Sequence, residues 1–150
     1  MSDLTSNSLG KNDWQSYLCT VNDKPSSIFF DLALANHAPF VGQPKLAWLW
    51  IKLNSPNEEG LSTDAEFAAL CKYEDDLEIL LSQHKSWHYV GRITTDGRRE
   101  FYFYIPENED FDLAIDGFLA ANPEYEFQTG EKLDVAWDQY FKVLFRKNIE

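Results

Sequence analysis

The chain is poor in cysteine and has no long apolar run. Its only cysteines among 150 residues are Cys19 and Cys71. Neither belongs to a CxxC pair, so we expect both to be reduced residues of the core. No apolar stretch approaches the roughly 20 residues that a membrane-spanning helix needs. The N-terminal segment MSDLTSNSLGKND is polar and lacks the apolar stretch of a signal peptide. We therefore expect a cytoplasmic protein without membrane contact.

Positive charge is scarce as well. The chain has 13 lysine and arginine residues against 25 aspartate and glutamate residues, which gives a net charge of −12. A negative field of this size repels phosphate backbones and anionic lipid surfaces, so nucleic acid is not an expected partner. The acids are concentrated in residues 58–78 and 107–138. They favour a protein partner with a basic surface.

The common signatures of catalysis are also missing. The sequence contains no GxSxG nucleophile elbow, no phosphate-binding P-loop and no GxGxxG dinucleotide motif. His84 and His88 have the spacing of two zinc ligands on a helix, but Lys85 and Ser86 interrupt that helix and no third ligand is near in the sequence. We therefore expect neither a metal site nor a cofactor.

One acidic residue lies in an unusual place. Asp31 interrupts the apolar run IFFDLAL, where a carboxylate must either be paired or point outward. We expect a structural ion pair between Asp31 and an arginine of the segment 87–104. The alternative is a small-molecule or hydrolytic enzyme that uses the region of Asp31, Arg92 and Glu100.

Apolar residues are abundant enough for a folded domain. The hydrophobic fraction is 44% and the aromatic fraction is 15%, which is far above the values typical of disordered chains. The length suits one domain with a core of its own. We expect a loose tail over residues 1–12 and a single α+β domain over residues 13–150.

The later part of the chain predicts a ferredoxin-like fold. Residues 45 to about 130 read as β-α-β-β-α-β, the order of that fold. The first helix, 63–83, is expected to begin with a capping box in which Thr63 and Glu66 each satisfy a free N–H group. A C-terminal helix, 134–146, follows, with its first residue as the cap.

The position of the N-terminal strands is left open by the sequence. Residues 13–21 and 26–35 read as an extra hairpin joined by a turn. Together with the ferredoxin-like core they give an antiparallel sheet of five to six strands. A duplicated β-β-α unit, over 27–83 and then 87–121, is the competing arrangement.

The segment WHYVGRITTDGRREFYFY, residues 87–104, predicts a β-hairpin. Asp96-Gly97 is a strong signal for a two-residue turn, because a type I′ turn needs positive φ at both positions. The residues that flank the turn then pair with each other, and Val90 pairs with Phe103. One face is rich in phenylalanine and belongs to the core: His88, Val90, Arg92, Phe101, Phe103 and Ile105. The other face is amphipathic: Trp87, Tyr89, Gly91, Ile93, Glu100, Tyr102 and Tyr104.

The amphipathic face has the composition of an interaction surface, because Trp, Tyr and Arg are frequent in interface hot spots. We predict that it binds a partner, unless the helix 134–146 lies over it. Tyrosines on such a sheet are also typical of RNA-recognition domains, but the glycine of their signature and a basic surround are missing. The candidate binding residues are Asp31, Trp87, Tyr89, Arg92, Arg98, Arg99, Glu100, Tyr102 and Tyr104.

Several strings together resemble a bacterial domain-of-unknown-function family, DUF695. They are DWQSY, FFDLAL, GLSTDAEFAAL, YVGRITTDGRREFYFY and AWDQYF, and the resemblance covers about residues 13–145. It implies an α+β domain without a settled activity. The stretch Trp137–Tyr140–Phe141 is also distantly similar to the small acidic inhibitors of ribonuclease E.

These observations predict a non-enzymatic protein-interaction or regulatory module. Its expected partner is a basic protein, such as a nuclease. The enzyme described above is the alternative, and RNA binding through the sheet aromatics is the third possibility. Both a monomer and a homodimer are compatible with the sequence.

Overall fold

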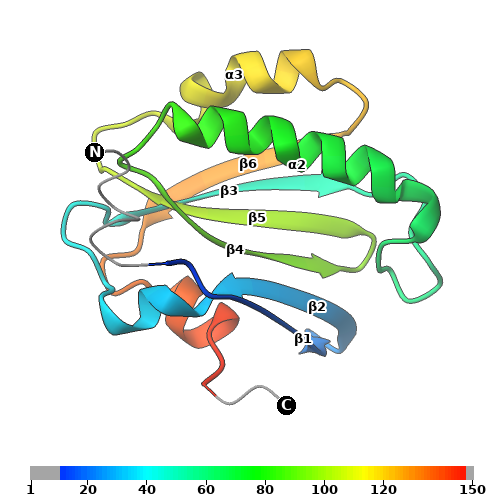
Figure 1. Ribbon diagram of the computed structural model, residues 1–150, viewed down its shortest axis with the longest axis horizontal. Helices are drawn as coiled ribbons and strands as arrows, with labels where there is room; N and C mark the ends of the chain where they lie inside the picture. The colour runs from blue at the N-terminus through cyan, green and yellow to red at the C-terminus, as the bar shows by residue number, and fades with distance from the viewer. Residues whose placement is uncertain (1–10, 148–150) are drawn as a thin grey trace.

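The computed structural model describes residues 11–147. Six antiparallel strands form one sheet in the order β1-β2-β4-β5-β3-β6, and two helices lie on one of its faces (Figure 1). The predicted tail lies outside the described residues, except for Lys11 and Asn12. The strands are β1 (Trp14–Val21), β2 (Lys24–Asp31), β3 (Lys45–Lys52), β4 (His88–Thr95), β5 (Arg98–Ile105) and β6 (Phe127–Leu133). The α-helices are α2 (Phe67–Ser82) and α3 (Phe111–Ala121). Short 3₁₀ helices form η1 (Leu32–Asn36) and η2 (Asp64–Glu66), and η3 (Gln139–Leu144) is a short π-helix.

The ferredoxin-like core is confirmed. Strands β3, β4, β5 and β6 alternate with α2 and α3 along the chain, and they lie in the order β6-β3-β5-β4. Strand β3 already has β5 and β6 as partners, so the N-terminal hairpin joins the free edge of β4, where β2 pairs with it. The duplicated β-β-α arrangement is therefore wrong, because β2 does not lie beside β3.

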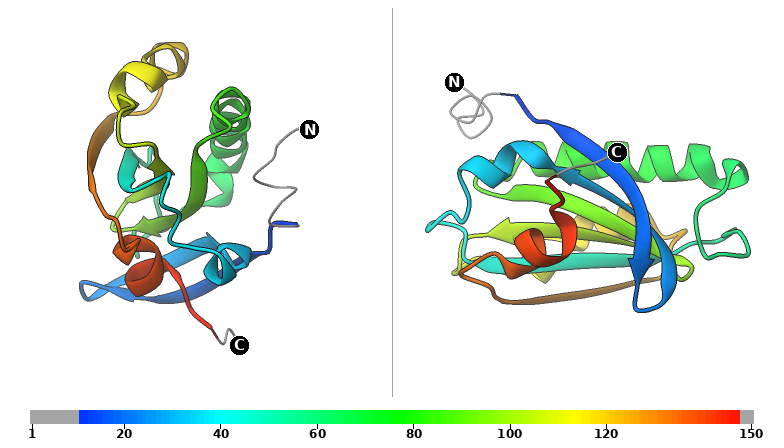
Figure 2. Two further views of the ribbon diagram at one scale, coloured as in Figure 1. Left: turned by 90° about the vertical axis from the view of Figure 1, so that its left-hand side faces the viewer. Right: turned by 90° about the horizontal axis from the view of Figure 1, so that it is seen from below.

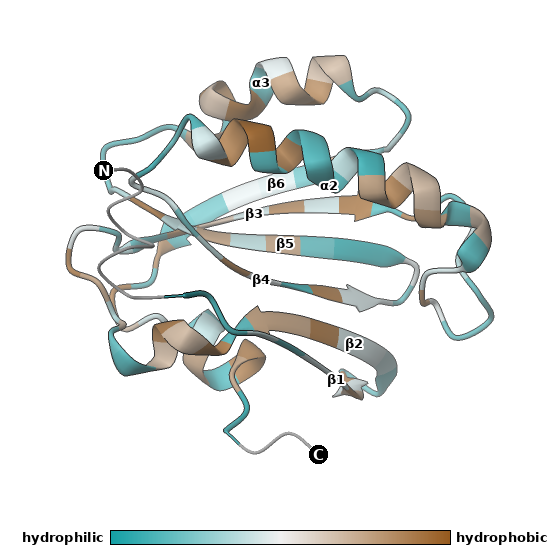
Figure 3. Cartoon of the chain, in the orientation of Figure 1, coloured by the Kyte–Doolittle hydropathy of each residue, from teal (hydrophilic) through white to brown (hydrophobic). Residues whose placement is uncertain are grey.

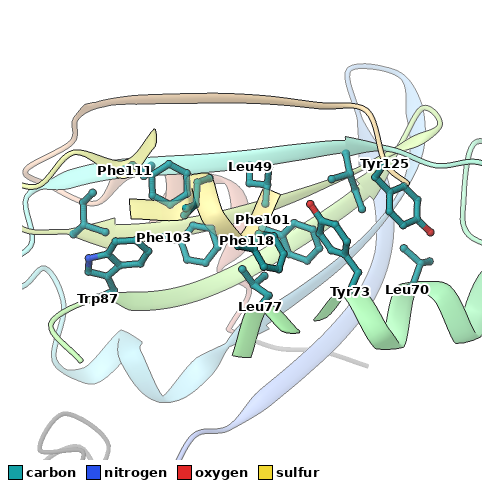
Figure 4. Close-up of a cluster of buried hydrophobic side chains, with 14 of the residues drawn as sticks. Leu49, Leu70, Tyr73, Leu77, Trp87, Phe101, Phe103, Phe111, Phe118 and Tyr125 are labelled. Carbon is teal, nitrogen blue, oxygen red and sulfur yellow. The ribbon is translucent and has the colours of Figure 1, made fainter. Parts of the chain in front are cut away.

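The first core lies between the sheet and the two helices. Leu70, Tyr73 and Leu77 recur at helical spacing along α2 and are buried against the sheet. Figure 4 shows Tyr73 and Leu77 beside Phe101 of β5, and Leu70 beside Tyr125. Tyr73 has ring contacts with Phe101, Phe118 and Tyr125, which tie α2, β5 and the end of α3 together.

The start of α2 differs from the prediction. Thr63 makes no capping bond, and its hydroxyl donates to the carbonyl oxygen of Ser55 at 2.7 Å. The buried carboxylate of Glu66 instead accepts the N–H groups of Asn54 and Ser55 at 2.9 and 2.8 Å, and the hydroxyl of Tyr125 at 2.6 Å. The predicted capping box is therefore wrong, because the Glu66 carboxylate accepts its hydrogen bonds from three groups outside α2.

The hairpin β4–β5 has the expected turn but contains a bulge. Thr95 pairs with Arg98 as predicted, yet Tyr89 rather than Val90 lies opposite Phe103. The register shifts between Tyr89 and Gly91, so Val90 is the extra residue of a β-bulge. Four of the predicted face assignments are corrected, because Trp87 lies in the helix-side core and His88 contacts Trp137 on the opposite face. Tyr89 packs against the helix-side core, and Val90 belongs to the cluster on the opposite face.

Gly91 explains where the bulge occurs. A Cβ atom at this position would lie 2.5 Å from the carbonyl oxygen of Phe29. Only glycine allows β4 to approach β2 this closely while β4 also pairs with β5. The opposite face of the sheet is then closed by the curled hairpin β1–β2 together with η1 and η3 (Figure 2).

A second core on this opposite face contains Val90, Tyr102, Tyr104 and Trp137, and it covers the face that was predicted to bind a partner. Tyr102 and Tyr104 are only 5% and 0% exposed. The Trp137 ring stacks on Tyr104 with centroids 4.0 Å apart. The predicted helix 134–146 is shorter, spanning Gln139–Leu144, because Trp137 has a φ of 58° that a helix cannot continue through. The carboxylate of Asp134 still accepts the N–H groups of Asp138 and Gln139 at its start.

We predict that Gly91→Ala destabilises the protein by about 1–3 kcal/mol, because the new methyl group collides with backbone atoms of β2. The measurement is the free energy of unfolding in urea. Gly117→Ala is the control. Gly117 has open space around its Cβ direction on α3, so we expect it to stabilise the protein by roughly 0.5–1 kcal/mol. Equal effects of both changes would contradict the close approach.

A second prediction concerns pH. Burial alone would raise the pKa of Glu66, but the Tyr125 hydroxyl and the two backbone N–H groups outweigh it and lower the pKa. Its carboxylate therefore stabilises the fold above the unfolded pKa of about 4.3, and this stabilisation is lost as the pH falls through the lower folded pKa. We expect Glu66→Gln to cost about 1–3 kcal/mol at pH 7.

The unfolding free energies of Glu66→Gln and the wild type should draw together as the pH falls below the unfolded pKa of about 4.3, and they should converge below the lower folded pKa, where the wild-type carboxylate is protonated in both states. Glu59→Gln is the matched control on an exposed loop residue. Its unfolding free energy should follow the wild type at every pH. A pH-independent difference for Glu66→Gln would contradict the proposed role of the carboxylate.

Candidate functional site

The three arginines of the hairpin separate onto the two faces of the sheet. Arg92 and Arg99 point to the helix side, where both bind the carboxylate of Glu74 on α2. Arg98 lies on the opposite face and pairs with Glu100. Each guanidinium therefore has a carboxylate partner inside the molecule. The predicted binding residues Arg92, Arg98 and Arg99 do not form one cationic surface.

Asp31 is structural, as predicted, but its partner is not an arginine. Its side chain accepts the N–H groups of Asp13 and Ala33 at 2.9 and 3.1 Å and the amide of Asn12 at 2.6 Å. It thereby caps η1 and fixes the start of β1. An arginine is not needed because these three donors satisfy the buried carboxylate.

The three residues of the alternative catalytic region, Asp31, Arg92 and Glu100, do not come together at one point. Arg92 lies opposite Phe101 and Ile93 lies opposite Glu100, so Arg92 and Glu100 occupy different faces of the sheet. Glu100 is buried, and it accepts the hydroxyl of Tyr102 at 2.6 Å. Asp31 is engaged at the far end of β2. These three residues cannot act on one substrate atom.

The other predicted binding residues are mostly internal. Trp87 is buried in the helix-side core, and its indole N–H donates to Glu109 at 2.7 Å. Tyr104 donates to Asp134 at 2.7 Å. Burial raises the pKa of both Tyr102 and Tyr104, so their phenols stay neutral near pH 7. The expected stacking surface is covered, and of the predicted aromatics only Tyr89 is partly exposed.

An open groove lies beside α2, where the sheet extends beyond its helices. Two helices cover one face of a six-stranded sheet, and the helix-side face of β1 and β2 is left beside them (Figure 2). The groove has a volume of about 310 Å³. We call it the α2 groove, and its lining residues are Trp14, Phe29, Cys71, Glu74, Asp75, Leu77, Glu78, Leu81, Tyr89 and Arg92.

The floor of the α2 groove is aromatic. The rings of Trp14 and Phe29 stack with centroids 4.8 Å apart and planes 9° apart. Tyr89 lies 5.3 Å from Trp14. The guanidinium carbon of Arg92 is 4.5 Å above the Phe29 ring. Sequence reasoning named Tyr89 and Arg92 but missed Trp14 and Phe29. Their alternation in β1 and β2 places both on the helix side, and that signal was available.

The wall of the groove is the acidic side of α2. Glu74, Asp75 and Glu78 recur there at helical spacing with Cys71. Glu74 is neutralised by two arginines, whereas Asp75 and Glu78 are exposed and form no ion pair with any described residue. Figure 3 shows hydrophilic positions along α2. The α2 groove therefore combines an aromatic floor with two carboxylates, those of Asp75 and Glu78, that form no ion pair with any described residue.

A second hollow lies at the opposite end of the sheet. It has a volume of about 580 Å³ and lies between the turn of the β4–β5 hairpin and the start of β6. The guanidinium of Arg98 stands 4.6 Å above the Trp50 ring there. Lys52 and Arg98 face Asp96 and Glu126 across this hollow, so its charge has no dominant sign.

The two cysteines differ in exposure, and His84 and His88 both stack on aromatic rings. Cys71 is exposed on α2, so the prediction that it belongs to the core is wrong. Burial raises the pKa of the Cys19 thiol, which makes it a weak nucleophile. His84 stacks on Trp87 and His88 on Phe40, with centroids 4.2 and 4.5 Å apart.

Two general features of the described residues complete this picture. Over residues 11–147, no three His, Cys, Asp or Glu side chains come together in a way that would hold a metal ion. In the same range, no helix has both the length and the apolar character needed to cross a membrane.

Comparison with known proteins gives one family. A model described as a family of unknown function, DUF695, matches residues 12–145. No curated protein and no solved structure matches the chain significantly. The distant similarity to ribonuclease E inhibitors stays a prediction.

The shared carboxylate of Glu74 gives the third prediction. Arg99 is 8% exposed, so removing its counter-charge leaves a nearly buried cation unpaired. We expect Glu74→Gln to lower the free energy of unfolding by about 1–3 kcal/mol. Asp76→Asn is the control, because it removes the exposed Lys72–Asp76 pair on the same helix. That change should cost less than about 0.5 kcal/mol. Similar costs for the two variants would refute a special role of Glu74.

Proposed function

The chain belongs to the DUF695 family, and from this premise we propose that it is a non-enzymatic interaction module that binds a basic protein partner. The supporting observation is the way its charges are distributed. The hairpin arginines are bound by carboxylates inside the molecule. Apart from Asp76, which is paired with Lys72, the carboxylates of the two helices that are exposed form no ion pair with any described residue.

We call this surface the acidic helix layer, meaning the exposed sides of α2 and α3. Lys72 is the only basic residue in either helix, and it is already bonded to Asp76 at 2.9 Å. The exposed acids of the layer are Asp75, Glu78, Asp112 and Asp116.

Cations gather on other elements. Lys142 belongs to η3, on the face opposite the helices, and Arg146 stands 4.2 Å above the Tyr17 ring of β1. The exposed acids of the acidic helix layer orient an approaching partner, and they raise the rate of association with a positively charged surface. A nuclease is one kind of partner that fits, because its nucleic-acid-binding surface is basic and an acidic protein can occupy it.

The fourth prediction tests the acidic helix layer. Affinity capture from the native host, followed by mass spectrometry, should recover a basic protein whose binding weakens as the salt concentration rises. The double variant Asp112→Asn with Asp116→Asn should reduce this capture by about three- to tenfold, mainly through slower association.

The matched control is Asp23→Asn with Asp138→Asn. Both residues are exposed, and they lie on the β1–β2 turn and beside η3. This variant has the same net charge as the α3 variant but leaves the acidic helix layer intact. Equal losses in both variants, or capture that salt does not change, would contradict the proposal.

A further inference from the structure

We propose that the α2 groove binds an arginine side chain of the basic partner. The inference rests on the proposed function and names the site where the partner is recognised. It is independent of the acids on α3, because the groove is formed by α2, β1, β2 and β4.

The floor of the groove suits a planar cation. Trp14 and Tyr89 line the groove and are partly exposed, whereas the Phe29 ring is already in contact with both Trp14 and Arg92. Aromatic faces attract cations through their quadrupole, and arginine stacks on them more often than lysine does. Arg92 already stacks on Phe29 in this way at 4.5 Å. The floor therefore accepts a guanidinium in the protein's own structure.

The wall supplies the counter-charge. Asp75 and Glu78 are exposed and face the groove from successive positions of α2. Glu74, the third carboxylate of the wall, is occupied by Arg92 and Arg99. A guanidinium offers five N–H donors in a rigid plane, so it can stack on the rings and bond to a carboxylate at the same time. An ammonium group on lysine is a point charge without the flat face.

The α2 groove is also left uncovered by the described helices. The described helices α2 and α3 cover the core made by β3, β5 and β4, and neither lies over the N-terminal hairpin (Figure 1). Its volume of about 310 Å³ is near the lower limit of ligand sites. This size favours one inserted side chain over a larger ligand.

The fifth prediction uses three short peptides as probes: acetyl-Gly-Arg-Gly amide, its citrulline analogue and its lysine analogue. Citrulline keeps the shape of arginine but has no charge. Titrations followed by nuclear magnetic resonance should show the arginine peptide shifting the indole N–H signal of Trp14. Its affinity should exceed that of the citrulline peptide about fivefold and that of the lysine peptide about twofold.

Two variants locate the contact. Glu78→Gln should weaken binding of the arginine peptide about threefold, whereas Glu124→Gln, another exposed acid beyond the groove, should leave it unchanged. Trp14→Leu should remove the peptide-induced shift of the backbone N–H signal of Tyr89, which also lines the groove. If Trp14→Leu also disturbs the hairpin, Glu78→Gln still decides the matter, because its side chain is exposed and unpaired. Equal affinity for arginine and citrulline, equal affinity for arginine and lysine, or shifts outside the groove would overturn the assignment.

The two proposals fail in different ways. If Glu78→Gln leaves capture of the basic partner unchanged while the α3 double variant reduces it, the arginine site is wrong and the interaction module stands. If the arginine peptide binds in the groove but no basic protein is captured in a salt-dependent way, the proposed function fails and the groove remains a guanidinium site.

Discussion

The close contact between Gly91 and the backbone of Phe29 is the constraint on which most of this architecture depends. A ferredoxin-like core of four strands has two open edges, and here one of them accepts the N-terminal hairpin. Because β4 pairs on both sides, Tyr89 turns to the helix side and Val90 to the other. The same pairing brings the rings of β1 and β2 beside α2. Both the covered face and the open groove follow from it.

Patterns local to the chain predicted the elements well. The β-α-β-β-α-β order and the Asp96-Gly97 turn could be predicted because they depend on neighbours in sequence. The bulge was missed because the alternation rule assumes an uninterrupted strand, although a glycine inside a strand was a warning. The helix after Asp134 was placed correctly but made too long, since no pattern indicates that Trp137 takes a positive φ.

The candidate site was harder to predict, because it depends on which charges meet in space. Glu66 looked like the end of a capping box, and Asp31 looked like the partner of an arginine. Each found other donors at a distance in sequence. Glu74 stood among several acids that the sequence could not distinguish, yet within residues 11–147 it is the acid that binds two arginines. Composition predicted an acidic protein, and only the fold shows which of the described carboxylates are engaged in ion pairs.

The second core is built from the two ends of the described chain. Tyr17 donates to the carbonyl oxygen of Leu144 at 2.7 Å, and Tyr140 donates to that of Asp31 at 2.6 Å. Phe30 has ring contacts with both Tyr140 and Phe145. During synthesis the hairpin β1–β2 emerges long before these partners, so its apolar face must wait uncovered until residue 145 has left the ribosome. The residues of the helix-side core end at Tyr125, so all of them are synthesised before the last residues of the second core.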